Sequence, residues 1–124
     1  VERIGHGVRA IEDEELLEQI AARRIPLEIC PISNIRTGVI SSLAEHPIRD
    51  FHERGILVTV NTDDPKMFGN TLAEEYRSLE EKAGFSRDQV RQLILNSIEA
   101  TWISKDRKES MGQSFADDLN WIAS

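Results

Sequence analysis

The segment VNTDDP, residues 60–65, places two adjacent carboxylates, Asp63 and Asp64, at the end of an apolar stretch and just before a proline. Two unit charges about 4 Å apart repel by roughly 1 kcal/mol in water and roughly 4 kcal/mol at the effective dielectric of a protein surface. A bound cation, a raised pKa, hydrogen-bond donors or solvation in an exposed turn would relieve this repulsion. The pair is therefore the strongest local candidate for a functional site.

A histidine flanked by two glycines is a second candidate. His6 stands in the tripeptide GHG, at the predicted end of a strand. Glycines on either side remove side-chain bulk, so that a metal or ligand can approach, and they permit unusual backbone angles. The tripeptide alone is equally typical of a histidine held in a loop by ordinary hydrogen bonds.

Polar side chains also follow the apolar stretch IPLEIC. Ser33, Asn34 and Thr37 would orient a substrate or a neighbouring group, but capping of a turn or helix is the favoured interpretation. Cys30 lies within the apolar stretch, and we interpret it as a small buried residue rather than a nucleophile.

The predicted elements bring these candidates together. Three short apolar stretches predict strands that end near His6, Pro31 and Asp63, with helices expected at 12–24 and 47–54 between them. This order is typical of successive parallel βαβ units, whose strands have their carboxyl ends on one side of the sheet. His6 and Asp63 should therefore converge, although periodicity alone does not separate a closed barrel from a doubly wound sheet.

Beyond residue 70 the sequence predicts helices. Thr71 with Glu74, and Ser86 with Gln89, form capping-box patterns ahead of apolar residues at helical spacing. Residues 104–110 are rich in charge, and we expect them to be an exposed connection to a last helix.

Two further predictions concern where side chains lie. The last helix should begin near Ser114 and point three apolar residues inward: Phe115, Leu119 and Ile122. His46 and His52 are interpreted as surface residues, away from the edge where the strands end.

Composition narrows the class of protein. The 124 residues are 40% hydrophobic and 30% charged, which are globular values. Fifteen Lys and Arg against 22 Asp and Glu give a net charge of −7, so nucleic acid is not an expected partner. No apolar run of membrane-spanning length or signal-peptide pattern is present, and Cys30 is the only cysteine, so a reducing cytoplasm is the default expectation.

Four segments, ERIGHGV, CPISNIRTG, NTDDPKMFGNTLAEEY and VRQLILNSIEAT, together resemble the C-terminal half of the adenosine deaminase family of metal-dependent purine deaminases. The match runs from Val1 to about Trp102, and the remainder matches only loosely. The resemblance implies an α/β fold in which residues 1–124 are a single segment. That segment would be the C-terminal part of a (β/α)8 TIM barrel, about its last three βα units plus terminal helices. The N-terminal part of the barrel would lie upstream or in another chain.

The resemblance also implies roles for individual residues. Asp63 looks like the carboxylate ligand of one zinc ion, and Asp64 looks like the residue that hydrogen-bonds the imidazole-ring nitrogen of the purine. His6 looks like the histidine that orients the metal-bound water, whose pKa the zinc lowers. Ser33 and Asn34 would have a supporting role only.

The implied reaction is the zinc-dependent hydrolysis of adenosine to inosine and ammonia by a longer chain. Alternative substrates are adenine, an N6-substituted AMP or a futalosine-type nucleoside. A more distant alternative is that the protein is an amidohydrolase of another substrate class. The family's His-x-His pair and its His with a general-acid Glu three residues later are not among these 124 residues. The segment alone should therefore be inactive, and a catalytically incomplete half-barrel with a structural or binding role is the alternative of another class.

Overall fold

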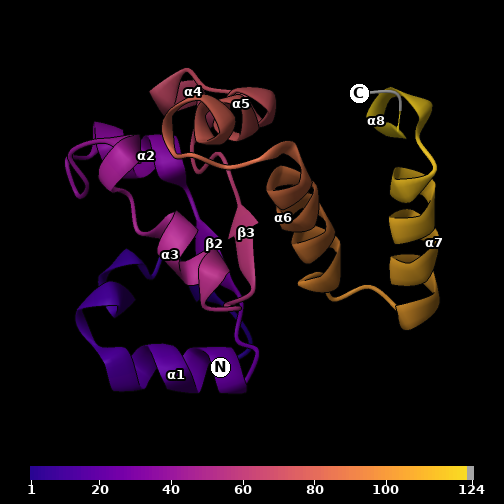
Figure 1. Ribbon diagram of the computed structural model, residues 1–124, viewed down its shortest axis with the longest axis horizontal. Coiled ribbons are helices and arrows are strands. Elements are labelled where there is room, and N and C mark those ends of the chain that lie inside the picture. Colours follow the sequence, from indigo (N-terminus) through magenta and orange to yellow (C-terminus); the bar gives the residue numbers. More distant parts are fainter. Residues whose placement is uncertain (123–124) are drawn as a thin grey trace.

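The computed structural model describes residues 1–122, which form a three-stranded parallel sheet with helices packed around it (Figure 1). Strands β1 (Ile4–Gly5), β2 (Leu27–Ile29) and β3 (Val58–Val60) lie in sequence order, so β2 pairs with both neighbours. The predicted alternation of strands and helices, and the parallel direction of the strands, are confirmed. No helix in the described part of the chain is long and apolar enough to cross a membrane.

Helices connect the strands and then continue to the end of the described chain. In order they are η1 (Val8–Glu12), α1 (Glu14–Ala22), α2 (Pro31–Arg36), η2 (Leu43–Glu45), α3 (Ile48–Glu53), α4 (Pro65–Phe68), α5 (Leu72–Lys82), α6 (Arg87–Glu99), α7 (Lys105–Ala116) and α8 (Leu119–Ile122). Both predicted capping boxes are present, at the starts of α5 and α6. In Figure 1, α6 lies beside β3, and α7 stands beyond it at the edge of the molecule.

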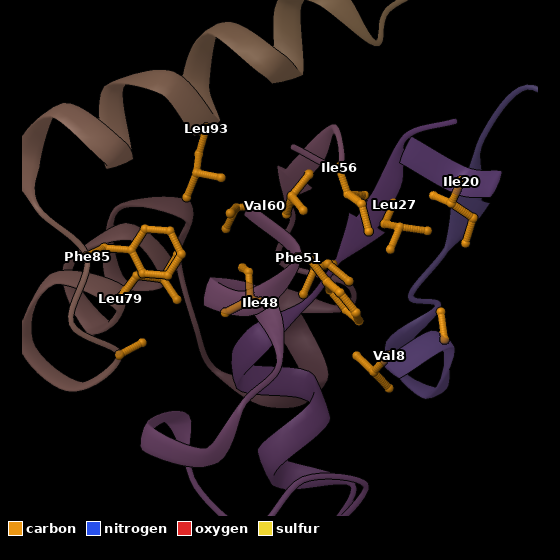
Figure 2. Close-up of a cluster of buried hydrophobic side chains, with 14 of the residues drawn as sticks. Val8, Ile20, Leu27, Ile48, Phe51, Ile56, Val60, Leu79, Phe85 and Leu93 are labelled. Carbon is orange, nitrogen blue, oxygen red and sulfur yellow. The ribbon is translucent and has the colours of Figure 1, made fainter. Parts of the chain in front are cut away.

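The hydrophobic core lies between one face of the sheet and the helices. Figure 2 shows side chains from strands and helices gathered in this layer, among them Leu27 of β2, Phe51 of α3 and Leu93 of α6, all fully buried. Burying a side chain of this size contributes about 1.5–3 kcal/mol. Because strand side chains alternate, a buried Leu27 and Ile29 leave Glu28 and Cys30 on the opposite face.

That opposite face carries polar side chains. Glu28 stands between Gly5 of β1 and Thr59 of β3 in the strand register. The Arg3 guanidinium lies 3.2 Å from the Glu28 carboxylate and 3.8 Å from the centre of the Trp102 ring. The face that is not used for the core is therefore lined by groups that hold charge and donate or accept hydrogen bonds.

The prediction that residues 104–110 form a connection is wrong, because α7 begins at Lys105. The Ser104 side chain accepts a hydrogen bond from the backbone N–H of Arg107 and so caps the helix. Lys105, the first residue of the helix, forms an ion pair with Glu109 one turn later, with Nζ and Oε1 3.8 Å apart. The charges that suggested a loop thus occupy the faces of a solvated helix.

The last apolar residues also differ from expectation. Leu119 is 78% exposed rather than inward. Phe115 is half-buried, with its ring centre 5.2 Å from that of Trp121. The side chain of Ile122 lies outside the described part of the structure, so that part of the prediction has no outcome. At the chain end, Trp121 therefore packs against the hydrophobic core and Phe115 packs on Trp121, whereas Leu119 faces solvent.

The outer edges of the sheet generate a first prediction. Within residues 1–122, β1 and β3 each pair on one side only, which leaves backbone donors and acceptors open along both edges. Expressed alone, residues 1–124 should aggregate or associate, as measured by size-exclusion chromatography with light scattering. A monodisperse monomer with a cooperative melting transition would contradict this.

Candidate functional site

His6 and Asp63 come together where the parallel strands end. His6 follows β1, Cys30 follows β2 and Asp63 follows β3. One ligand-type atom from each of the three side chains lies within 4.8 Å of the other two, and His6 Nε2 is 3.7 Å from Asp63 Oδ2. They border an open pocket of about 460 Å³, which Glu28 and Leu72 also line. The predicted convergence of these strand ends is observed.

The backbone of both polar residues is unusual. His6 has φ 56° and Asp63 has φ 59°, in the left-handed region that few residues other than glycine adopt. Such conformations cost on the order of 1–3 kcal/mol and persist where the surroundings enforce them. The His6 N–H still donates to the Glu28 carbonyl at 3.0 Å. The hydrogen-bond ladder therefore continues to the His6 N–H, where the chain turns sharply, and Asp63 makes a similar turn three residues after β3.

A short helix that the sequence did not reveal supports Asp63. Pro31 occupies the first turn of α2, directly after β2, so the polar turn is helical. Ser33, only 1% exposed, donates from its Oγ to Asp63 Oδ2 at 2.7 Å. Hydrogen bonds to a charged group contribute about 1.5–3 kcal/mol. Ser33 therefore contacts the carboxylate itself and does more than stabilise its own turn.

Asn34 and His46 lie behind His6. Asn34 Nδ2 is 3.4 Å from His6 Nδ1, and Asn34 Oδ1 is 3.0 Å from His46 Nε2. His46 is only 5% exposed, so the prediction that it is a surface residue is wrong. The turn around η2 folds back over α2 and buries it, and this burial lowers the pKa of His46 to about 4. A loop carries no periodic pattern from which this packing could be predicted.

His52 is also less exposed than expected. Its side chain is half-buried, and its ring centre lies 5.7 Å from that of Phe85. Burial lowers the pKa of this histidine as well. The structure therefore corrects the surface interpretation of both histidines and connects only His46 to the candidate site.

The two adjacent carboxylates have different partners. Asp64 is exposed, and its Oδ1 accepts from the Met67 N–H at 2.9 Å, which caps α4. Asp63 instead takes the Ser33 hydroxyl and faces His6. Their mutual repulsion is thus offset by separate donors.

Cys30 and the metal-type donors form one group. Cys30 is 6% exposed, as predicted, and burial raises the pKa of its thiol to about 12, so it is neither a thiolate nor a nucleophile near neutral pH. Carboxylate oxygen and imidazole nitrogen are zinc ligands, and a complete site has three or four protein ligands. The donors at this strand edge fit part of a zinc site, with Asp63 supplying the carboxylate ligand type.

A buried carboxylate missed by the sequence analysis connects the loops around the site. Glu75 is 0% exposed; its Oε2 accepts from the Ile32 N–H at 3.1 Å and its Oε1 from Asn70 Nδ2 at 2.6 Å. Asn70 Nδ2 also donates to the Thr62 carbonyl at 3.1 Å, next to Asp63. Burial raises the pKa of Glu75. The available signal was its spacing: Glu75 precedes the buried Leu79 by four residues and so shares its helix face.

Replacing Glu75 by Gln should destabilise the protein despite the similar shape. Both Glu75 oxygens accept hydrogen bonds, so a Gln side chain would set its own NH2 against another donor. We expect the free energy of unfolding to fall by about 1–3 kcal/mol in urea titrations of the whole protein. Glu81→Gln, an exposed change on the same helix, is the matched control. Equal stability of the two variants would show that the network is not energetically significant.

His46 should make stability depend on pH. Its folded pKa of about 4 lies below its ordinary value of 6.5, so the unfolded chain binds the proton more readily between these values. His46 thus costs no stability above pH 6.5, and stability falls as the pH drops toward 4, by up to about 3 kcal/mol. In urea titrations, His46→Gln should remove this part of the pH dependence. Identical slopes for the two proteins would contradict the assignment.

Residues 1–117 match the adenosine deaminase family, and the chain belongs to that family. It is 44% identical over 115 residues to the adenosine deaminase of Salmonella schwarzengrund, covering 93% of this chain and 34% of that protein. The chain thus spans about a third of the length of this curated relative.

Solved structures agree with this fold. The adenine deaminase of Arthrobacter aurescens superposes with a TM-score of 0.92 at 33% identity, covering 100% of this chain and 37% of that one. An amidohydrolase from Burkholderia ambifaria with bound zinc gives a TM-score of 0.87 at 25% identity, over 99% of this chain and 35% of that one. The three strands and their helices therefore correspond to the C-terminal part of an amidohydrolase (β/α)8 barrel.

Proposed function

We propose that the whole protein to which this chain contributes deaminates a purine nucleoside hydrolytically with zinc, converting adenosine to inosine and ammonia. The observation that carries this is the approach of His6 Nε2 to Asp63 Oδ2, 3.7 Å apart, at an open pocket in a chain of the adenosine deaminase family. The zinc-bound amidohydrolase among the similar structures supports the choice of metal.

Asp63 would hold the zinc ion through its carboxylate, with Ser33 fixing Oδ2 by the 2.7 Å hydrogen bond. Zinc, when bound, would supply Lewis-acid activation of the attacking water. His6 would orient that water by a hydrogen bond from its ring, and its left-handed backbone turns the ring toward Asp63. Holding reactants about 3 Å apart in the correct orientation supplies a large part of an enzymatic rate gain.

Asp64 would read the imidazole ring of the purine. Its Oδ1 is used to cap α4, so the other oxygen, Oδ2, would meet the ring nitrogen. A carboxylate and a ring nitrogen both accept hydrogen bonds, so this contact requires one proton between them. Asp64 would therefore discriminate a purine that shares this proton from a base lacking the ring nitrogen.

The reaction balances as a substitution of water for ammonia. A bond forms between the water oxygen and the amino-bearing carbon, and the carbon–nitrogen bond then breaks. One proton of the water reaches the leaving nitrogen, which departs as ammonia, and the other ends on the ring nitrogen next to the new carbonyl group. We propose that the proton donor, and the remaining metal ligands, come from the rest of the barrel.

The substrate within the purine class is open to a direct comparison. The similar structure from Arthrobacter aurescens is an adenine deaminase, so adenine is the principal alternative to adenosine. An N6-substituted AMP and a futalosine-type nucleoside complete the panel. The net charge of −7 weighs mildly against a phosphorylated substrate. If none of these is deaminated by the zinc-loaded whole protein, the structural or binding alternative is favoured.

Removing the Asp63 carboxylate should remove metal and activity together. In the whole protein, we expect Asp63→Ala and Asp63→Asn to lose stoichiometric zinc by elemental analysis. Adenosine deamination, followed by ultraviolet absorbance, should fall about 100-fold or more. Asn tolerates the left-handed backbone of this position, which separates loss of the ligand from backbone strain.

Asp50→Asn is the matched control, because Asp50 is an acidic residue on α3 that pairs with Arg54. It should retain both zinc and activity. Full zinc occupancy in the Asp63 variants would overturn the assignment of Asp63 as a ligand.

A further inference from the structure

A continuous chain of hydrogen bonds leads from the start of α3 to the candidate site. The Ile48 N–H donates to His46 Nδ1 at 3.0 Å, His46 Nε2 lies 3.0 Å from Asn34 Oδ1, and Asn34 Nδ2 lies 3.4 Å from His6 Nδ1. Asn34 and His46 are 3% and 5% exposed, so bulk water does not compete for these groups. This chain of hydrogen bonds connects the Ile48 N–H to the ring of His6.

The direction of each hydrogen bond follows from the backbone end. A backbone N–H only donates, so His46 Nδ1 accepts and carries no proton. Burial lowers the pKa of His46 to about 4, so the ring is neutral near pH 7 and its one proton is on Nε2. That proton goes to Asn34 Oδ1, which leaves the Asn34 NH2 group facing His6.

The same reasoning extends to His6. An NH2 group facing His6 Nδ1 requires that this nitrogen accept, so a neutral His6 carries its proton on Nε2. Nε2 is the atom that lies 3.7 Å from Asp63 Oδ2 and borders the pocket. With the proton on Nδ1 instead, His6 would present a lone pair to the pocket and would accept rather than donate.

We propose that His46 and Asn34 are positioning residues that set the tautomer of His6, so that His6 presents an Nε2–H donor to the pocket beside Asp63. Neither residue borders the strand-end pocket lined by His6 and Asp63, and both act through the His6 ring. The catalytic consequence rests on the proposed function, because an oxygen nucleophile held beside Asp63 needs a donor. The tautomer itself is independent of that function.

Asn34→Asp is the sharpest test, because it keeps the shape and reverses the polarity toward His6. Asp would still accept from His46 Nε2, but would also accept from His6, so a proton should appear on His6 Nδ1. The measurement is nitrogen-15 NMR of the histidine rings in the whole protein, metal-free and zinc-loaded, with His6 assigned by a His6→Gln variant. If Nε2 loses its proton as Nδ1 gains one, kcat should fall about 10- to 100-fold with KM unchanged, whereas a ring protonated on both nitrogens keeps its Nε2–H donor and should keep most of kcat.

Two changes at His46 repeat the test without adding charge. A Gln at 46 is able to accept from Ile48 and donate to Asn34, so His46→Gln should keep the proton of His6 on Nε2 and most of kcat. His46→Leu offers neither group, so Asn34 is free to reverse and the two His6 tautomers should mix. His52→Leu removes a half-buried ring outside this chain of hydrogen bonds, and it should change neither the His6 spectrum nor kcat.

The outcomes separate this proposal from the proposed function. A His6 protonated on Nδ1 in the native protein, or a tautomer unaffected by Asn34→Asp, would overturn the inference. Equal spectra and kcat for His46→Gln and His46→Leu would overturn it too. If the tautomer responds as expected but no purine is deaminated, the positioning of His6 stands and the proposed function fails.

Discussion

Parallel pairing of three short strands is the constraint on which the site depends. Parallel strands need a long crossover between them, and here helices supply each one. These helical crossovers bring the carboxyl end of each strand to the same edge of the sheet, so residues as distant in sequence as His6 and Asp63 meet there. Leu27 of the central strand and Phe51 of α3 anchor the arrangement from the core side. The apolar layer thus determines where the polar side chains stand.

The two carboxylates Asp63 and Glu75 each have specific hydrogen-bond donors. Asp63 is stabilised by the Ser33 hydroxyl, and the fully buried Glu75 by the Ile32 N–H and Asn70. An unpaired buried carboxylate would cost several kcal/mol more than these bonded ones. The compensating donors come from α2 and from the segment between α4 and α5, so the segments around the pocket are connected by hydrogen bonds as well as by apolar packing.

The sequence predicted those parts of the structure that leave a local pattern. Apolar stretches with abrupt ends marked the strands, and Ser86 with Gln89 marked the start of α6. It failed where tertiary packing decides. The burial of His46 depends on a turn that folds back over α2. The start of α7 was not predicted because the residues after Ser104 are mostly charged, which is typical of an exposed connection.

The candidate site shows the same division. Parallel topology and the family resemblance were enough to expect His6 and Asp63 to converge. Ser33 and Asn34 were noticed as polar residues after a strand, but their partners could not be read from spacing, since the contacts to Asp63 and His6 span 30 and 28 residues. Glu75 was overlooked because it stands next to Glu74 in the sequence, and two adjacent glutamates in a helix are usually both exposed to solvent. Its burial follows from donors, Ile32 and Asn70, that only the structure shows.

The left-handed backbone at His6 and Asp63 has an evolutionary consequence. Glycine, Asn, Asp and His are the residues best tolerated at such angles, whereas β-branched residues are strongly opposed. Random drift at these two positions is therefore filtered by conformation before selection acts on chemistry. A lineage that abandoned this site would pass most easily through Asn or Gly, keeping an intact fold around a silent pocket.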